Sequence, residues 1–315
     1  VKDAVKKTII SGVNVIDTAI NYRSQKAERS VGKAIKELVE SNTVKRDGIF
    51  ISTKNGYVTN DGDSKEEFWE NIQNTLVKTG VIKSGDISSG YHCMTVPYLQ
   101  DQLSRSLKNL DMDCIDLMYL HNAAEGQLQD MPREEFLKKL YDVFQFYEEQ
   151  RKIGTIRYYG MATWDCFRVP PEHQTYLSLY EITKIAEKAG GTDNGFKFIQ
   201  LPYNMYLDQA LTQENQSIDG TKHSILQASK KLGIGVFTRV PLMQAKLLAP
   251  NVLPEFGNLT TPSHRAIQFV RSTPGVIAPL VGQKSQEHVN ENLGVMSTPV
   301  LEESEFFDLI KKLSS

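Results

Sequence analysis

The feature that most constrains the fold is a regular alternation of short β-branched runs with stretches of helical apolar spacing. Seven runs are predicted to be buried strands, at residues 13–17, 49–54, 115–121, 156–162, 198–202, 234–238 and 276–281. Apolar residues between the runs recur every three or four positions, as at Leu99, Leu103 and Leu107. This order predicts a parallel sheet covered by helices, as either an open doubly wound sheet or a closed (β/α)8 barrel.

The strand count bears on that choice. Residues 1–11 have helical spacing and precede the first run, so a closed eight-stranded barrel needs one more strand ahead of Val1. We expect an α/β fold of the (β/α)8 TIM barrel type, with the first strand and its following loop missing from the chain as given. An open sheet would not need that strand. Residues 1–315 are predicted to form a single barrel domain with a C-terminal helix at about 301–314.

The stretch 55–96 is too long for a bare connection between a strand and the next clear helix. We expect it to hold a short helix near 65–77 and then an ordered loop. Loops that follow strands gather at the C-terminal face of a barrel, where active sites lie. This insertion is therefore a candidate wall of a substrate site.

Composition excludes several classes of protein. Lys and Arg number 36 and Asp and Glu 38, so the net charge of −2 argues against a nucleic-acid binder. No run approaches the roughly 18 apolar residues that span a bilayer, so we expect no membrane segment. The three cysteines are odd in number and lack CxxC spacing, which favours the cytoplasm. No HExxH, GxSxG or Cys/His ligand spacing is present, so neither a metal site nor a hydrolase is expected.

Polar residues follow three of the predicted strands. Asp17 ends the first run and Tyr22 comes five residues later, while Lys54 and His121 end the second and third runs. Each alone would be an ordinary cap or a satisfied polar group. All four at the mouth of one barrel point to an active site, with Asp17 as the partner that a buried Lys54 needs.

The segments that carry these residues resemble the aldo-keto reductases, a family of (β/α)8 barrels that use a nicotinamide cofactor. The similar segments, in chain order, are GVNVIDTAINY, SVGKAI after Glu28, DCIDLMYLHN, GTIRYYGMATW, FIQLPYN and GVIAPLVGQKSQEHVNENL. They extend from residue 12 to about 293. The resemblance is specific for the family and weak for the substrate, which we expect to be a small carbonyl compound.

The resemblance implies an Asp-Tyr-Lys-His catalytic tetrad. Tyr22 would be the general acid that protonates the carbonyl oxygen as hydride arrives. Lys54 would favour the ionised phenol, and Asp17 would hold the ammonium in place. His121 would donate a hydrogen bond to the substrate oxygen or relay the proton.

The resemblance also implies the cofactor contacts. Gln200 would bind the nicotinamide carboxamide, and Leu242 lies in the loop PLMQAKL that wraps the pyrophosphate. Lys284 and Ser285 match the positions that bind an adenosine 2′-phosphate. His288 and Asn292 match positions that contact the adenine side of the cofactor. Because a cation beside a hydroxyl suits a phosphate, NADPH is expected rather than NADH.

Two positions depart from the family pattern. A Ser-Asn pair that holds the carboxamide is replaced by Ala162 and Thr163, and an aromatic residue that stacks on the nicotinamide is replaced by Arg239. Threonine offers one hydroxyl in place of an amide. Arg239 is expected either to bias the site toward the reduced cofactor or to reach the pyrophosphate.

Two functions remain open at this point. The first is an NADPH-dependent carbonyl reductase, and the second is a cofactor-binding regulatory or redox-sensing subunit with slow or no turnover. The oligomeric state also stays open. Aromatic residues in loops after strands suggest an apolar mouth, and Cys166 there is expected to be inert; the aromatic residues are Tyr57, Tyr91, Trp164, Phe167, Tyr203 and Tyr206.

Overall fold

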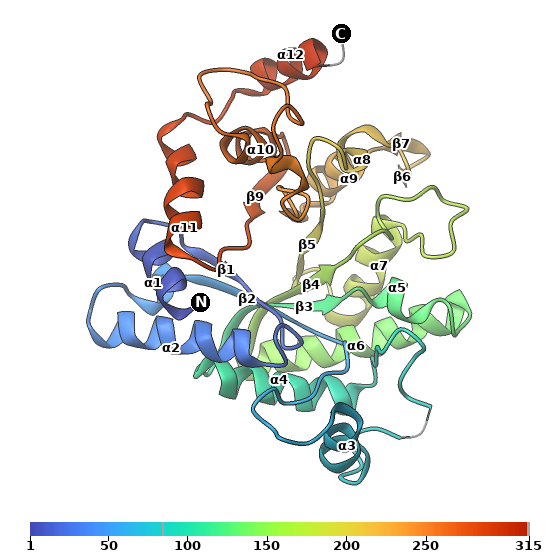
Figure 1. Cartoon of the computed structure of the whole chain (residues 1–315). Helices are drawn as coiled ribbons and strands as arrows, with labels where there is room; N and C mark the ends of the chain where they lie inside the picture. The colour runs from blue at the N-terminus through green and yellow to red at the C-terminus, as the bar shows by residue number, and fades with distance from the viewer. Residues whose placement is uncertain (84, 314–315) are drawn as a thin grey trace.

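The structure, a computed structural model, describes residues 1–83 and 85–313. In these residues seven parallel strands form one sheet in the order β1-β2-β3-β4-β5-β8-β9 (Figure 1). The strands are β1 (Val15–Asp17), β2 (Phe50–Asn55), β3 (Ile115–His121), β4 (Ile156–Ala162), β5 (Phe196–Pro202), β8 (Gly235–Arg239) and β9 (Val276–Leu280). All seven predicted runs are strands.

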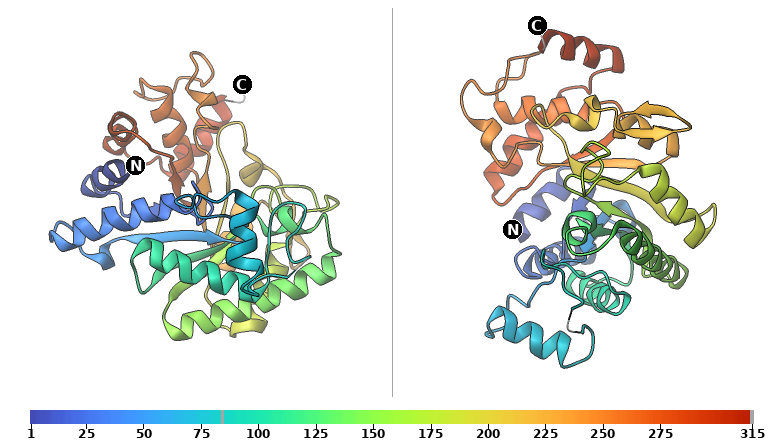
Figure 2. Two further views of the ribbon diagram at one scale, coloured as in Figure 1. Left: turned by 60° about the horizontal axis from the view of Figure 1, so that its bottom comes forward. Right: turned by 90° about the vertical axis from the view of Figure 1, so that its right-hand side faces the viewer.

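The strand order decides between the two predicted architectures. A doubly wound sheet reverses its strand order at a switch point, whereas here each strand pairs with the next of the sheet along the chain. The sheet therefore curls into a nearly closed barrel with helices around it (Figure 2). Within the described residues β1 and β9 are its two edges.

Helices cover the outer surface of the curled sheet. The longer ones are α1 (Lys2–Ile10), α2 (Lys26–Glu40), α4 (Val96–Leu110), α6 (Arg133–Ile153), α7 (Leu179–Gly190), α9 (Ile225–Leu232), α10 (Pro262–Arg271), α11 (Gln286–Leu293) and α12 (Glu303–Leu313). Short helices α5 (Ala123–Gln127) and α8 (Gln209–Thr212) lie in the connections. Position 314 of the predicted C-terminal helix lies outside the described residues.

The two ends of the barrel sheet are joined by helices. α1 packs beside α11 (Figure 1). Thr8 on α1 donates a hydrogen bond from Oγ1 to Oε1 of Gln283, at 2.9 Å, in the loop before α11. The helix that precedes β1 and the helix that follows β9 therefore lie against each other at the open side of the sheet.

The insertion after β2 contains the expected short helix. It consists of α3 (Phe68–Ile72) and a π-helical continuation at Gln73–Val77, and it projects below the barrel in the view of Figure 1. The connection between β5 and β8 contains a hairpin that the sequence analysis did not predict, formed by β6 (Gln216–Ile218) and β7 (Thr221–His223). Its turn residues Asp219 and Gly220 both have positive φ, the conformation that an Asp-Gly hairpin turn favours.

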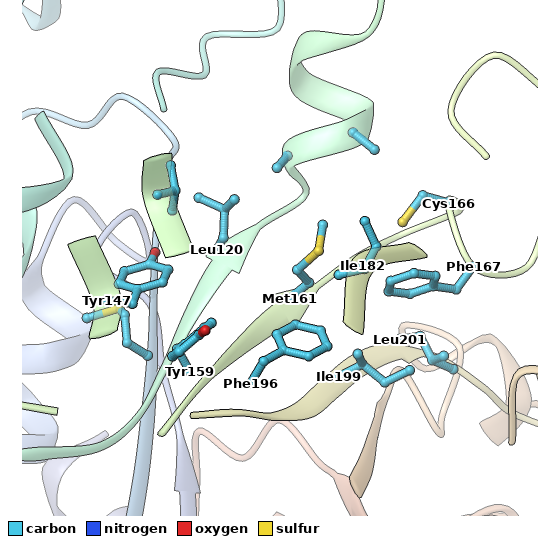
Figure 3. Close-up of a cluster of buried hydrophobic side chains, with 14 of the residues drawn as sticks. Leu120, Tyr147, Tyr159, Met161, Cys166, Phe167, Ile182, Phe196, Ile199 and Leu201 are labelled. Atoms are coloured by element: carbon cyan, nitrogen blue, oxygen red, sulfur yellow. The ribbon is translucent and has the colours of Figure 1, made fainter. Parts of the chain in front are cut away.

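The core has two layers because side chains alternate along each strand. Leu117 and Tyr119 of β3 pack inside the barrel with apolar residues of the other strands, including Phe50, Phe198 and Phe237. Met118 and Leu120 point the other way and join the large core between sheet and helices. Figure 3 shows part of this outer layer, where Tyr147 and Ile182 of the covering helices lie close to the sheet. The other labelled residues are Cys166 and Phe167 of the loop after β4 and, on the strands, Leu120, Tyr159, Met161, Phe196, Ile199 and Leu201.

Candidate active site

The alternation that fills the barrel also places the predicted site residues. Asp17, Lys54, His121, Gln200 and Arg239 lie at or near the carboxyl ends of their strands, in step with the inward-facing apolar residues below them. They therefore converge on the mouth of the barrel, where the active sites of (β/α)8 enzymes lie.

A buried ion pair forms the floor of this site. Nζ of Lys54 lies 2.5 Å from Oδ2 of Asp17 and donates a second hydrogen bond, at 2.8 Å, to the carbonyl oxygen of Thr18. The Lys54 side chain is fully buried and that of Asp17 is 12% exposed. Oδ1 of Asp17 accepts from Ser52 Oγ at 2.6 Å and from Gln200 Nε2 at 2.9 Å. The carboxylate thus links β1, β2 and β5.

Tyr22 stands above this pair. Nζ of Lys54 lies 4.9 Å from the centroid of the Tyr22 ring, and the ring is 36% exposed, so the phenol can reach a bound molecule. The loop that carries Tyr22 continues through Arg23, Ser24 and Gln25, all with positive φ. The structure therefore brings the phenol, the ammonium and the carboxylate together.

His121 completes the predicted four. Its ring centroid lies 6.1 Å from that of Tyr22 in an edge-to-face arrangement. Burial, helped by the charges of Lys54 and Arg239, lowers the pKa of His121 well below its usual value. Nδ1 of His121 is buried without a hydrogen-bond partner. A neutral imidazole with a free nitrogen at the mouth can exchange hydrogen bonds with a bound ligand.

His92 is a site residue that the sequence did not reveal. It is fully buried, and its Nε2 donates to the carbonyl oxygen of His121 at 2.9 Å. Nδ1 accepts from Gln127 Nε2 at 3.0 Å, which fixes the neutral tautomer. A Cβ at Gly56 would lie 2.4 Å from Nε2 of this ring, so the neighbouring backbone fits it closely. His92 thereby ties the insertion after β2 to the end of β3.

Two buried oxygens lie free at the positions predicted for the carboxamide. Gln200 donates an amide N–H to Asp17, and within residues 1–83 and 85–313 neither its Oε1 nor Oγ1 of Thr163 has a hydrogen-bond partner. An amide acceptor and a hydroxyl together match the two hydrogen-bonding ends of a carboxamide. These two residues therefore fit a nicotinamide.

The loop around Thr163 is held by a carboxylate that was also missed. Oε1 of Glu125 accepts the backbone N–H groups of Trp164, Asp165 and Cys166, at 2.8, 2.6 and 3.1 Å. A single oxygen that binds three successive amides fixes the turn after β4. It thus sets the position of Trp164 at the rim.

Arg239 occupies the place where an aromatic residue was expected. Its Nη2 donates to Oδ1 of Asn122 at 3.0 Å and to the carbonyl oxygen of Thr163 at 2.8 Å. The guanidinium carbon lies 4.7 Å from the centroid of the Trp164 ring. Arg239 is therefore anchored within the mouth itself.

The remaining predicted cofactor residues follow the last two strands of the sheet, β8 and β9. Leu242 packs in a small apolar cluster with Leu247 and Leu253 after β8. The others are at the start of α11 or on it: Lys284, Ser285, His288 and Asn292. Ser285 caps that helix by accepting the N–H of His288 through Oγ, while Lys284 is exposed.

The aromatic residues predicted for the mouth differ in their exposure. Phe167 and Tyr203 are fully buried and belong to the core. Tyr57 lies edge-on to His121, with ring centroids 5.1 Å apart. Tyr91, Trp164 and Tyr206 are exposed. Cys166 is fully buried, which raises the pKa of its thiol well above the usual value.

Two other features are absent from the part of the chain that the structure describes. No cluster of three or more His, Cys, Asp or Glu side chains suits a metal ion in residues 1–83 and 85–313. No helix in the same part of the chain has the length and apolar character needed to cross a bilayer.

A parallel barrel with an ionisable cluster at its C-terminal mouth defines an α/β-barrel enzyme scaffold. The sequence profile of the Aldo/keto reductase family matches residues 1–314. The chain belongs to this family of oxidoreductases, and the predicted resemblance and barrel fold are confirmed.

Individual relatives are distant. The chain is 22% identical to the uncharacterized oxidoreductase YqkF of Bacillus subtilis (strain 168), over 96% of this chain and 83% of that protein. Its structure is similar to the holo form of aldo-keto reductase AKR11C1 from Bacillus halodurans, with a TM-score of 0.60, 21% identity, and coverage of 98% and 86%. It is also similar to an aldo/keto reductase from Klebsiella pneumoniae in complex with NADP and acetate, with a TM-score of 0.59 and 20% identity, over 98% of this chain and 83% of that chain. These structures establish the shared fold.

Burial lowers the pKa of His92 from 6.5 to about 4. Between these two pH values the imidazole is therefore protonated in the unfolded chain and neutral in the folded chain. The free energy of unfolding should therefore fall as the pH drops from about 6.5 to about 4, by roughly 3 kcal/mol from this group. His92→Gln keeps a donor for the His121 carbonyl but cannot titrate. Urea unfolding at a series of pH values should show a shallower acid slope in this variant.

The matched control is His288→Gln, which removes an exposed histidine. It should keep the wild-type acid slope. If His92→Gln keeps the same slope as well, the buried neutral histidine contributes nothing to the pH dependence, and the assignment is wrong.

Proposed function

We propose that this chain is an NADPH-dependent oxidoreductase that reduces aldehydes or ketones to alcohols, with Tyr22 as the general acid. The observation that carries the proposal is the stack of Tyr22 over the Lys54 ammonium, which is itself held by Asp17. The Tyr22 phenol, the Lys54 amino group and the Asp17 carboxylate lie one below the other, so that the phenol at the top can deliver a proton to a bound substrate.

The roles of the chain's residues follow from this arrangement. Tyr22 gives its phenolic proton to the carbonyl oxygen of the substrate. Lys54 lies beneath the ring and stabilises the negative charge that remains on the phenol oxygen. Asp17 holds the Lys54 amino group in place. Neutral His121 holds the substrate oxygen through a hydrogen bond, with its backbone fixed by His92.

The cofactor assignment rests on the residues that are left with unused hydrogen-bonding capacity. Gln200 and Thr163 have the free acceptor and the hydroxyl that would hold the carboxamide. Bound NADPH would supply the hydride. The loop at Leu242 would cover the pyrophosphate, and the start of α11 would hold the adenosine end with the residues Lys284, Ser285, His288 and Asn292.

Location and partners complete the proposal. Cys93, Cys114 and Cys166 are free thiols, which suits the reducing cytoplasm. The partner is a small carbonyl substrate.

The first test is NADPH oxidation with 4-nitrobenzaldehyde. Tyr22→Phe should lower kcat by at least about 100-fold, because a positioned acid contributes that much to proton transfer. Tyr180→Phe is the matched control, since Tyr180 is also 36% exposed and also lies under a lysine, with Lys184 Nζ at 5.5 Å. It should keep wild-type activity.

Equal rates in the wild type and Tyr22→Phe would contradict the role of Tyr22. If the wild type binds NADPH but turns over no aldehyde, the chain is instead a cofactor-binding regulatory or redox-sensing subunit.

The second test addresses the choice of cofactor. Lys284→Ala should weaken NADPH binding by about tenfold, the effect of losing one charge-assisted contact to phosphate, and should leave NADH binding unchanged. Lys33→Ala removes another exposed lysine, on α2, and should change neither. Titration of intrinsic fluorescence with each cofactor measures both affinities. Equal losses for NADPH and NADH would show that Lys284 does not recognise the 2′-phosphate.

A further inference from the structure

The guanidinium of Arg239 is a cation without a counter-ion at the mouth of the barrel. Both hydrogen bonds of its Nη2 go to neutral oxygens, the Asn122 side-chain carbonyl and the Thr163 backbone carbonyl. Its Nε is buried without an acceptor. Among the described residues, no carboxylate forms an ion pair with it.

Most other partly buried arginines of this chain have a carboxylate partner. Arg29 pairs with Asp61, Arg46 with Asp116, Arg105 with Asp101, Arg151 with Glu148 and Arg168 with Asp165. Arg271 is the exception, since it donates to the backbone carbonyls of Val295 and Thr298, but it lies on α10 and not at the end of a barrel strand. A charge withdrawn from water without a partner is costly. Burial accordingly lowers the pKa of Arg239. A side chain kept in this state at a ligand-binding mouth is suited to receive an anion.

The anchors of Arg239 place it beside the reacting groups. Asn122 directly follows His121, and its Nδ2 donates to the hydroxyl of Tyr57 at 3.2 Å. The Tyr57 ring in turn contacts His121 edge-on. Among the groups whose charges oppose the effect of burial on the Arg239 pKa, Tyr22 comes first, ahead of Glu125 and Asp17.

Trp164 closes the other side. Its ring lies against the guanidinium and is 37% exposed at the rim. Arg239 is thus enclosed by Asn122, Thr163 and Trp164, and its position is fixed before any ligand arrives. A fixed donor costs less ordering on binding than a free arginine side chain.

We propose that Arg239 binds an anionic group of the substrate, so that the preferred substrates are carbonyl compounds that also carry a carboxylate. The inference rests on the proposed reductase function. It assigns to Arg239 a role in substrate choice, in place of the cofactor contact expected from the sequence. The cofactor's phosphates are the other source of an oxyanion, and the experiment separates the two.

The test compares 4-carboxybenzaldehyde with its neutral methyl ester, methyl 4-formylbenzoate. The ratio of their kcat/KM values measures recognition of the carboxylate. In the wild type it should favour the acid. Arg239→Met should reduce this ratio by about 10- to 100-fold, as expected for a hydrogen bond between charged groups, and Arg239→Lys should restore part of it.

Arg23→Met is the matched control, because Arg23 is an exposed arginine next to Tyr22 in the sequence. It should keep the wild-type ratio, which separates a specific contact from a general effect of charge. NADPH affinity is measured for the same variants by fluorescence. If Arg239→Met weakens NADPH binding and lowers both aldehyde rates equally, the anion belongs to the cofactor and the proposal is overturned. An unchanged ratio overturns it too.

A binding measurement keeps the inference testable if the reductase proposal itself fails. Should the wild type oxidise NADPH with neither aldehyde, calorimetry compares benzoate with benzamide. Tighter binding of benzoate to the wild type, lost in Arg239→Met, supports an anion site. Equal affinities in both proteins overturn it.

Discussion

The arrangement of the mouth depends on one buried ion pair. Lys54 has no exposed surface, and Asp17 and the Thr18 carbonyl oxygen surround its amino group, as a buried polar group requires. The same carboxylate accepts from Ser52 and Gln200. Three strands are thereby fixed at their ends, and Tyr22 is placed above the Lys54 amino group.

Much of the fold and site followed from local pattern. Period-two alternation identifies a strand and also predicts which of its residues face inward. Lys54 therefore faces the same side of its strand as Phe50, and His121 the same side as Tyr119. Once a parallel barrel was inferred, polar residues at inward positions near strand ends had to meet at one mouth. The hairpin at β6 and β7 was missed although Asp219-Gly220 is a strong turn signal, because its strands have only three residues each.

The supporting interactions could not be inferred in this way. His92 lies in an irregular loop and meets the carbonyl of His121 across 29 positions, while Glu125 reaches the amides after β4 across about 40. No periodicity marks such contacts, since they depend on how loops pack after the barrel has formed. The anchoring of Arg239 by Asn122 is of the same kind. The sequence pointed to the polar groups that meet at the mouth, and the structure revealed what holds them.

The most direct test is a double-mutant cycle on the ion pair, read as the free energy of unfolding in urea. Asp17→Asn and Lys54→Met should each destabilise the protein by about 3–5 kcal/mol, because each leaves a buried group without its partner. The double variant should be more stable than the sum of the two losses predicts, by at least about 2 kcal/mol. Additive losses would contradict the claim that Asp17 and Lys54 act as one unit beneath Tyr22.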